Sequence, residues 1–311
     1  MGAIGVETFF VISGLVIAMT LVKSQSALDF AVRRFARIYP AYVVAATLLA
    51  LVIHFAGGDF HVSWTDYLAT LTMAAPKLGA KFVDGAYWSL FVEVSFCVVA
   101  AATFALPKNR FWIGLIGLEF VGHCIRWLSV GLGDLLLMSH YLPLFLIGMA
   151  GWYYVFNAQA WPAAALLVAG LIGYAVDMHA IIRPRDQSLV VPANILLLGS
   201  IAVMFALLHF APMLRLGVLA RIGRMSYSLY LVHQTLGVII INRLVGQLGF
   251  PDAVGVAAAV LLSMVLALVM FEVVELRMQH IILAAWHHTR EHRLGQPKSL
   301  RGTARSGARV M

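Results

Sequence analysis

Long apolar segments follow one another along most of this chain, with only short polar interruptions. About nine of them approach the length of roughly 20 residues that a helix needs to cross the hydrocarbon core of a bilayer. A shorter apolar segment at 64–76 is expected to lie at the membrane interface or to re-enter the membrane. The pattern therefore predicts an all-α, polytopic transmembrane helix bundle. The nine expected spans are 4–22, 38–56, 87–105, 111–128, 139–157, 161–178, 191–210, 226–246 and 253–276.

Composition favours a membrane protein over a soluble fold. Of the 311 residues, 62% are hydrophobic and only 12% are charged, and the mean hydropathy is +0.90. A soluble domain of this size carries about 25% charged residues. A soluble fold would need helices that are apolar on every face and have no polar shell. One membrane domain is therefore expected to use nearly the whole chain.

The positive charges predict an orientation. The net charge of +8 comes largely from basic residues grouped in short loops and in the C-terminal tail. Alternating the nine spans puts these groups on one side, which the positive-inside rule assigns to the cytoplasm. Arg183 and Arg185 lie on the other side as a mild exception. Such grouping favours anionic lipid headgroups over nucleic acid as a partner. The basic loops are 23–37, 107–110 and 211–224.

The chain is expected to form one transmembrane domain over 1–285. A basic tail over 286–311 has no apolar period and is expected to be disordered in the cytoplasm. Cys97 and Cys124 both fall inside apolar segments, so they indicate neither a disulfide framework nor a metal site. The sequence has no metal-ligand spacing, no phosphate-binding glycine loop and no Gly-x-Ser-x-Gly elbow. We therefore expect no metal and no tightly bound cofactor.

Four segments carry motifs that follow one another in a recognisable order. They are GVETFFVISG at 5–14, RRFARIYP at 33–40, YWSLFVE at 87–93 and IGRMSYSLYLVH at 222–233. In order and spacing they resemble the acyltransferase 3 family, whose Arg-x-x-Arg motif falls on Arg34 and Arg37. Glu7 stands where the family usually has Asp, and 274–277 resembles its closing Glu-x-x-Arg region in weakened form. The resemblance covers about residues 4–280.

One part of the family pattern is missing. The family normally opens with a further span that carries a histidine regarded as its catalytic base. No histidine precedes Glu7 here, so that role cannot be carried over. One added N-terminal span would give about ten, with both ends in the cytoplasm. We therefore expect that the chain lacks the family's first transmembrane helix, through a truncated gene product or a late start codon rather than a genuinely shortened protein.

The resemblance implies a membrane-bound O-acyltransferase. The donor would be acyl-CoA as a co-substrate, with acetyl-CoA expected, and the acceptor a hydroxyl of a cell-surface or exported saccharide. The expected location is the bacterial cytoplasmic (inner) membrane, with the lipid bilayer as a further partner. The acceptor's identity, the acyl length and the oligomeric state are left open by the sequence.

The arginines of the second motif are candidates for donor binding. Arg33, Arg34 and Arg37 share one helical face if the loop continues into the next span. A guanidinium binds phosphate through two hydrogen bonds, so Arg34 and Arg37 could hold the phosphates of acyl-CoA. Ordinary anchoring by positive charge is the alternative.

Glu93 is the first catalytic candidate because it lies about five residues into an apolar span. An acidic group at such depth costs a few kcal/mol and faces a cavity or a partner. It could hold an acceptor hydroxyl, orient a base or pair with arginine; a packing carboxylate is the alternative. Trp88 and Ser89, in the same motif, are expected near the substrate, although Trp88 also suits an interfacial anchor.

A polar stripe on the fourth span gives the second catalytic candidate. Glu119, His123 and Arg126 lie at i, i+4 and i+7, hence on one helical face. Together with Glu7 and Glu93 they could line one outward-facing cavity, where His123 is the best local candidate for a substitute base. An internal ion-pair chain that only locks helices together is the alternative.

The fourth motif adds two cavity candidates. Tyr230 and His233 lie three residues apart on one face, where they could meet substrate or serve hydrogen-bonded packing. Glu275, near the cytoplasmic end of the last span, could pair with the basic loops. Two functions compete with acyl transfer: a transporter or flippase of a polar lipid or saccharide, and a catalytically inactive membrane partner.

Overall fold

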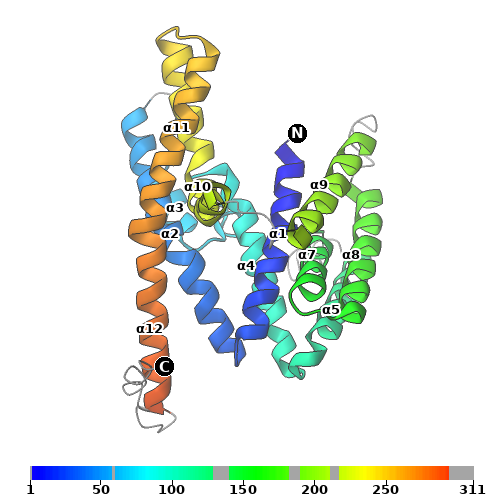
Figure 1. The fold of residues 1–311 in the computed structure, drawn as a ribbon. Helices are drawn as coiled ribbons and strands as arrows, with labels where there is room; N and C mark the ends of the chain where they lie inside the picture. Colours follow the sequence, from blue (N-terminus) through cyan, green and yellow to red (C-terminus); the bar gives the residue numbers. More distant parts are fainter. Residues whose placement is uncertain (1, 58–59, 129–139, 182–189, 211–216, 294–311) are drawn as a thin grey trace, which may run out of the picture.

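The computed structural model describes residues 2–57, 60–128, 140–181, 190–210 and 217–293. Helices supply all the regular secondary structure of these ranges (Figure 1). The first helices are α1 (Gly2–Lys23), α2 (Ala27–Ala56), α3 (Trp64–Leu71), α4 (Trp88–Ala102) and α5 (Phe111–Leu128). The others are α7 (Leu142–Val155), α8 (Ala160–Ile181), α9 (Val190–Phe210), α10 (Gly217–Ile241), α11 (Asp252–Met270) and α12 (Leu276–Arg293).

The helices confirm the predicted all-α membrane bundle. Within the described residues, 6 helices are long and apolar enough to cross a membrane, and three shorter apolar helices correspond to α7, α8 and α9. Large apolar side chains cover the outside: Phe55, Trp127 and Leu128 are more than 80% exposed. Such a surface is unfavourable in water and suited to lipid. The chain is therefore an integral membrane protein.

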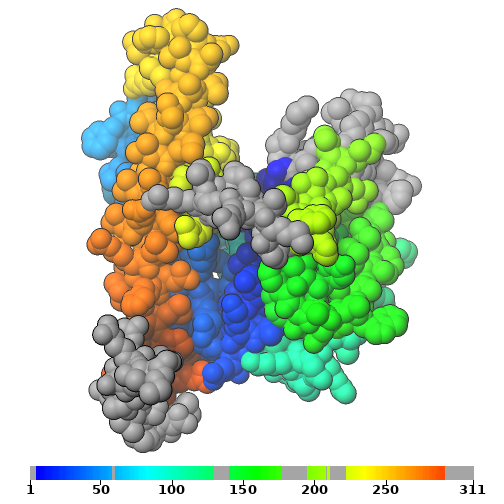
Figure 2. Space-filling view, in the orientation of Figure 1, coloured from blue at the N-terminus to red at the C-terminus, as the bar shows by residue number. Residues whose placement is uncertain are grey.

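Two hydrophobic clusters divide the bundle. The first joins α1, α4, α5, α7, α8 and α9 with Phe30 of α2, and the second joins α2, α4 and α10 with Met270 of α11 and the segment around α3. Helix α4 contributes to both clusters and links them. In Figures 1 and 2 the column of α11 and α12 and the group of α7, α8 and α9 lie on opposite sides of the molecule, with α1 between them.

Helices α1 and α7 approach closely because glycines meet at their crossing. A Cβ added at Gly14 would collide with the carbonyl of Phe145, and one at Gly148 with the carbonyl of Val11. Small residues are the usual means by which membrane helices pack backbone to backbone. This contact anchors α1, which forms one wall of the site described below.

Three element boundaries differ from the expected spans. Helix α2 begins at Ala27 rather than at 38, because Ser26 caps it by accepting a hydrogen bond from the Asp29 N–H at 3.1 Å. Helix α10 begins at Gly217. The last span continues through a π-helical segment, Phe271–Glu275, into α12, so part of the expected tail is helical and the rest lies outside the described residues.

Contacts between distant segments gather several basic residues at one end of the bundle. The Trp286 indole donates to Asp29 Oδ1 at 2.9 Å, and Arg290 donates to the Gln25 side chain. The Lys108 ammonium donates to the Val22 carbonyl at 3.3 Å. We call this the basic end. The loops with Arg183, Arg185 and residues 211–216 fall outside the described residues.

The segment expected at 64–76 forms α3 and a turn at the other end of the bundle. Helix α3 has 8 residues, too few to cross a bilayer. Ser63 caps it by accepting from the Asp66 N–H at 3.0 Å, and Asp66 Oδ1 accepts from the Lys81 N–H at 2.7 Å. These bonds tie α3 to the segment that leads back into α4.

Candidate functional site

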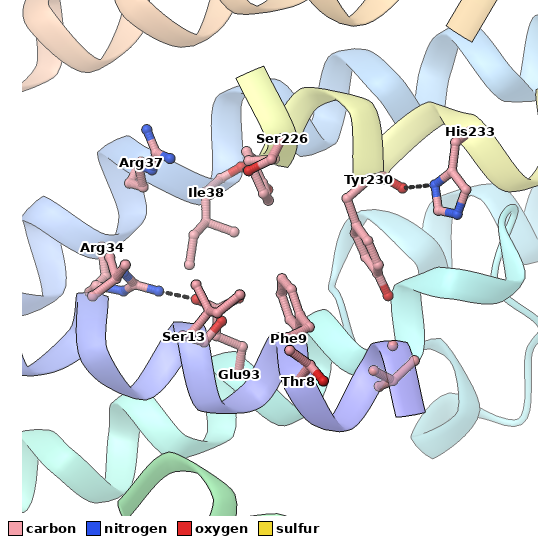
Figure 3. A pocket seen from close by; sticks show the side chains of 15 residues that line it. Thr8, Phe9, Ser13, Arg34, Arg37, Ile38, Glu93, Ser226, Tyr230 and His233 are labelled. Carbon is pink, nitrogen blue, oxygen red and sulfur yellow. Dashed lines mark hydrogen bonds and ion pairs between the residues drawn. The ribbon is translucent and has the colours of Figure 1, made fainter. Parts of the chain in front are cut away.

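A cavity of about 480 Å³ lies between α1, α2, α4 and α10 (Figure 3). It brings together five of the predicted site residues, from three of the four sequence motifs: Arg34, Arg37, Glu93, Tyr230 and His233. The first motif segment, on α1, supplies much of the remaining wall. Residues from 5 to 233 thus converge on one space, which no single motif could form.

The centre of this site is an ion pair between Arg34 on α2 and Glu93 on α4. The Arg34 guanidinium donates to Glu93 Oε1, and both residues are only 6% exposed. Burial removes two charges from water, so each strongly requires the other. The sequence suggested that Glu93 could pair with an arginine, and the structure shows this pair. Glu93 fixes the position of a cation at the cavity wall.

A second ion pair holds Arg37. Its Nη1 lies 2.6 Å from Glu275 Oε1, and the Ser228 hydroxyl donates to Glu275 Oε2 at 2.7 Å. Glu275 ends the π-helical segment, whose wider turn sets the direction of this side chain toward α2. The Arg37 side chain remains one-third exposed. It is thus positioned but still able to meet a ligand.

A basic pocket of about 260 Å³ adjoins the cavity. Its lining includes four cationic side chains: Lys23, Arg33, Arg34 and Arg37. The last two also line the cavity, so they form the boundary between the two spaces. Arg33 pairs with Asp29 at 3.2 Å, so three of the four cations already have a carboxylate partner. Their remaining N–H donors and the Lys23 ammonium make a site for an anion such as a phosphate group. Arg33, Arg34 and Arg37 thus lie together on α2, as their spacing indicated, and donor binding by Arg34 and Arg37 stays a prediction.

Tyr230 and His233 form the opposite wall of the cavity. The Tyr230 hydroxyl donates to the Ala86 carbonyl at 2.8 Å and lies 2.5 Å from Ser89 Oγ, and its ring stacks on Phe9 at 5.0 Å. His233 Nδ1 lies 3.0 Å from the Tyr230 carbonyl. That bond favours the tautomer with the proton on Nδ1, which leaves Nε2 as a proton acceptor.

Three further predicted residues are near this site but do not line the cavity: Glu7, Trp88 and Ser89. Ser89 is fully buried and supports Tyr230 as described. The Trp88 ring packs against Phe10 and Tyr141 at 6.0 and 5.5 Å, as part of an aromatic group. Glu7 follows the lining residue Val6 on α1 but interacts with Tyr174 of α8.

The polar stripe on α5 lies elsewhere, which corrects the expectation of one common cavity. His123 Nδ1 lies 3.6 Å from Glu119 Oε1, and the Glu119 carboxylate sits against Gly173 of α8. Neither they nor Arg126 line the cavity. The helical spacing placed them correctly on one face, but that face turns toward α8. His233 is the histidine that the described residues bring to the cavity.

Sequence reasoning missed several lining residues on α1. Gly5, Phe9, Ile12, Ser13 and Val16 all face the cavity. They recur at i, i+4, i+7, i+8 and i+11, which is one stripe of a helix. The helical spacing of these residues could be read from the first motif segment. The stripe does not stand out there, because nearly all faces of this helix are apolar. No group of three or more His, Cys, Asp or Glu able to hold a metal occurs among the described residues.

Comparison with known proteins gives one family and two curated relatives. The acyltransferase 3 family, described as an acyltransferase domain, matches residues 1–272. The chain is 24% identical over 267 residues to acyltransferase MdmB of Streptomyces mycarofaciens, covering 75% of this chain and 67% of that protein. It is 30% identical over 111 residues to nodulation protein 10 of Rhizobium leguminosarum bv. viciae, covering 30% of each. No solved structure matches the chain.

Proposed function

Because the chain belongs to the acyltransferase 3 family, and is thus a membrane acyltransferase, we propose that it transfers an acyl group from acyl-CoA to a saccharide hydroxyl. Acetyl is the expected group, and the saccharide is exported or exposed at the cell surface. The observation that carries the proposal is the arrangement of two adjoining spaces, one basic and one deep in the bundle, whose shared wall is Arg34 and Arg37.

The donor would enter at the basic end, which we assign to the cytoplasm of an inner membrane. Its phosphates suit the pocket formed by Lys23, Arg33, Arg34 and Arg37. Arginine forks bind phosphate through two parallel hydrogen bonds. The acyl thioester would then lie in the cavity beyond, with the acceptor arriving from the other end. Donor and acceptor would thus meet without either crossing the membrane.

The reaction needs a base, an oxyanion partner and a leaving group. His233 Nε2 would take the proton of the acceptor hydroxyl as its oxygen attacks the thioester carbonyl. Arg34, whose guanidinium has N–H donors beyond the one that Glu93 accepts, would stabilise the negative charge that develops on the carbonyl oxygen. The tetrahedral species then collapses, the C–S bond breaks, and the CoA thiolate receives the proton from His233. Glu93 serves as a positioning residue that holds Arg34.

The test uses purified protein in lipid nanodiscs with radiolabelled acetyl-CoA. Release of CoA and transfer of label to glycan extracted from the source cell envelope are measured together. Glu93→Gln is expected to lower transfer strongly while the protein still inserts, because a neutral amide holds the Arg34 guanidinium less firmly than a carboxylate does. Transport of saccharide without thioester cleavage would overturn the proposal in favour of a transporter.

A matched pair of variants tests the donor site. Arg37→Ala is expected to raise the KM for acetyl-CoA at least tenfold, because it removes one of the cations between pocket and cavity. Arg110→Ala removes an equal charge from an exposed position at the same end and is expected to leave KM unchanged. Equal KM values in both variants would show that Arg37 does not bind the donor and serves only as a positively charged membrane anchor.

A further inference from the structure

A second polar pocket, of about 260 Å³, lies at the end of the bundle away from the basic end. Residues 60–62 and 81–83 and helix α10 form its walls. On α10, Gln234 and Thr235 line this pocket, and they directly follow His233 of the cavity. The pocket and the cavity therefore border the same turn of α10, with the pocket on the side from which an acceptor would come.

The walls of this pocket are held by hydrogen bonds that use the Asp66 carboxylate and backbone N–H groups of the lining segments. Asp66 accepts from the Ser63 hydroxyl at 2.6 Å and from the Lys81 N–H at 2.7 Å. Thr70 Oγ1 accepts from the Val83 N–H at 3.0 Å. Buried Asp84 accepts from the Thr235 N–H at 2.9 Å, which joins the segment to α10. The pocket is thus built before any ligand binds.

Four polar side chains line the pocket with hydrogen-bonding capacity to spare. Among the described residues, the side chains of His61, Lys81, Gln234 and Thr235 make no hydrogen bond or ion pair. They combine donors and acceptors of several kinds. A ligand that carries several hydroxyl groups, each both donor and acceptor, matches such a set. The rings of Phe60 and Phe82 add apolar surface beside them.

An apolar cleft of about 430 Å³ adjoins the polar pocket, and Val62 lines both. Aromatic residues dominate it: Phe55, Trp64 and Tyr67 line it, the first two 81% and 80% exposed. The cleft lies between the end of α2 and the start of α3, on the lipid-facing surface. Aromatic rings of this kind concentrate at the interface of a membrane.

We propose that the polar pocket and the apolar cleft together bind the acceptor, which is a saccharide attached to a lipid chain. The sugar occupies the polar pocket beside His233, and the chain lies in the cleft against Phe55 and Trp64. A membrane lipid without sugar would leave the polar groups unmatched, and a free sugar would leave the cleft empty. The assignment of this ligand as acceptor rests on the proposed acyl transfer; the binding site itself does not.

The test is photo-crosslinking in nanodiscs without acyl-CoA, so that binding is measured apart from catalysis. The probes are decyl glucoside, decyl galactoside and decyl N-acetylglucosaminide, each with a diazirine at the end of the chain. We expect at least one probe to label the cleft around Phe55 and Trp64, as mapped by mass spectrometry. Excess of the matching methyl glycoside, which has the sugar but no chain, should reduce this labelling.

Two variants separate the two parts of the site. Gln234→Ala is expected to reduce labelling at least fivefold by removing a sugar contact, and Trp64→Ala to reduce it by removing a chain contact. Leu128→Ala, at an exposed lipid-facing position far along the sequence, is the control and should label as the native protein does.

The outcomes are distinct. Equal labelling by a diazirine-bearing decanol, or labelling outside the cleft with all three probes, would overturn the proposal. If the probes label the cleft but the protein does not cleave acetyl-CoA, the proposed acyl transfer is wrong. The proposed binding site for a lipid-linked sugar then still stands.

Discussion

Replacing Glu93 by leucine is expected to destabilise the protein by about 3–5 kcal/mol, because the Arg34 guanidinium is then buried without its carboxylate. The side chains of the pair are only 7% and 8% exposed, so water cannot compensate. Glu93→Gln should cost less, about 1–3 kcal/mol, since the amide oxygen still accepts a hydrogen bond from the charged group. Combining Arg34→Met with Glu93→Leu removes both charges and should restore stability to the native value or above it.

The chain contains its own reporter for this measurement. Cys97 is buried on α4, one helical turn after Glu93, whereas Cys124 is exposed. In a Cys124→Ser background, the rate at which a maleimide dye labels Cys97 follows unfolding during titration with SDS in mixed micelles. The free energy of unfolding of each variant then comes from the midpoint and slope of the titration.

The reasoning depends on the coupling between the two positions. Destabilisations that simply add in the double variant, or single variants that each cost less than about 1 kcal/mol, would refute it. Transfer activity is a second readout. The double variant should be stable yet inactive, because a cation at the cavity wall is still missing.

Three further predictions concern packing and the outer segment. Gly148→Ala is expected to destabilise by about 1–3 kcal/mol through the close crossing of α1 and α7, whereas Gly117→Ala, with nothing within 4 Å, should be neutral or slightly stabilising in the same SDS titration. Tyr230→Phe should cost about 1–2 kcal/mol by removing the hydroxyl bonds, and should lower transfer without changing acetyl-CoA affinity. Hydrogen bonds from the Ser63 hydroxyl and from the Lys81 N–H lower the pKa of Asp66. The stability that the ionised Asp66 contributes to this segment is therefore present above pH about 4, and it is lost as the pH falls through the lowered pKa. Asp66→Asn should therefore speed tryptic cleavage after Lys81 at pH 8, and unchanged cleavage would contradict this.

The positions of the helices follow closely from the sequence, because the length of an apolar segment is a local property. Every expected span coincides with a helix; the early start of α2 follows from the Ser26 cap, whereas α10 and the last span extend beyond their expected ends. The motifs named Arg34, Glu93 and His233 as separate candidates, and the structure brings all three to one cavity, a grouping that the sequence did not predict.

The sequence allowed an arginine partner for Glu93 and a basic-loop partner for Glu275, but it could not say which residue each would meet. Arg34 and Glu93 are 59 positions apart in the sequence. Arg37 forms its ion pair with Glu275, which is near the other end of the sequence. Spacing fixes the face of a helix that a residue occupies but not the neighbour that this face meets. That is why His123 and Glu119 were placed correctly on one face and expected at the wrong cavity.

The π-helical segment Phe271–Glu275 sets the rotational phase between the two halves of one long helix. A π turn holds one residue more than an α turn, so it shifts everything after it around the axis. Deleting a single residue there would turn the following helix by about 100° and carry its Arg290 away from Gln25, while α11 kept its packing. The length of this segment is therefore a separate constraint on the protein, independent of which side chains it carries.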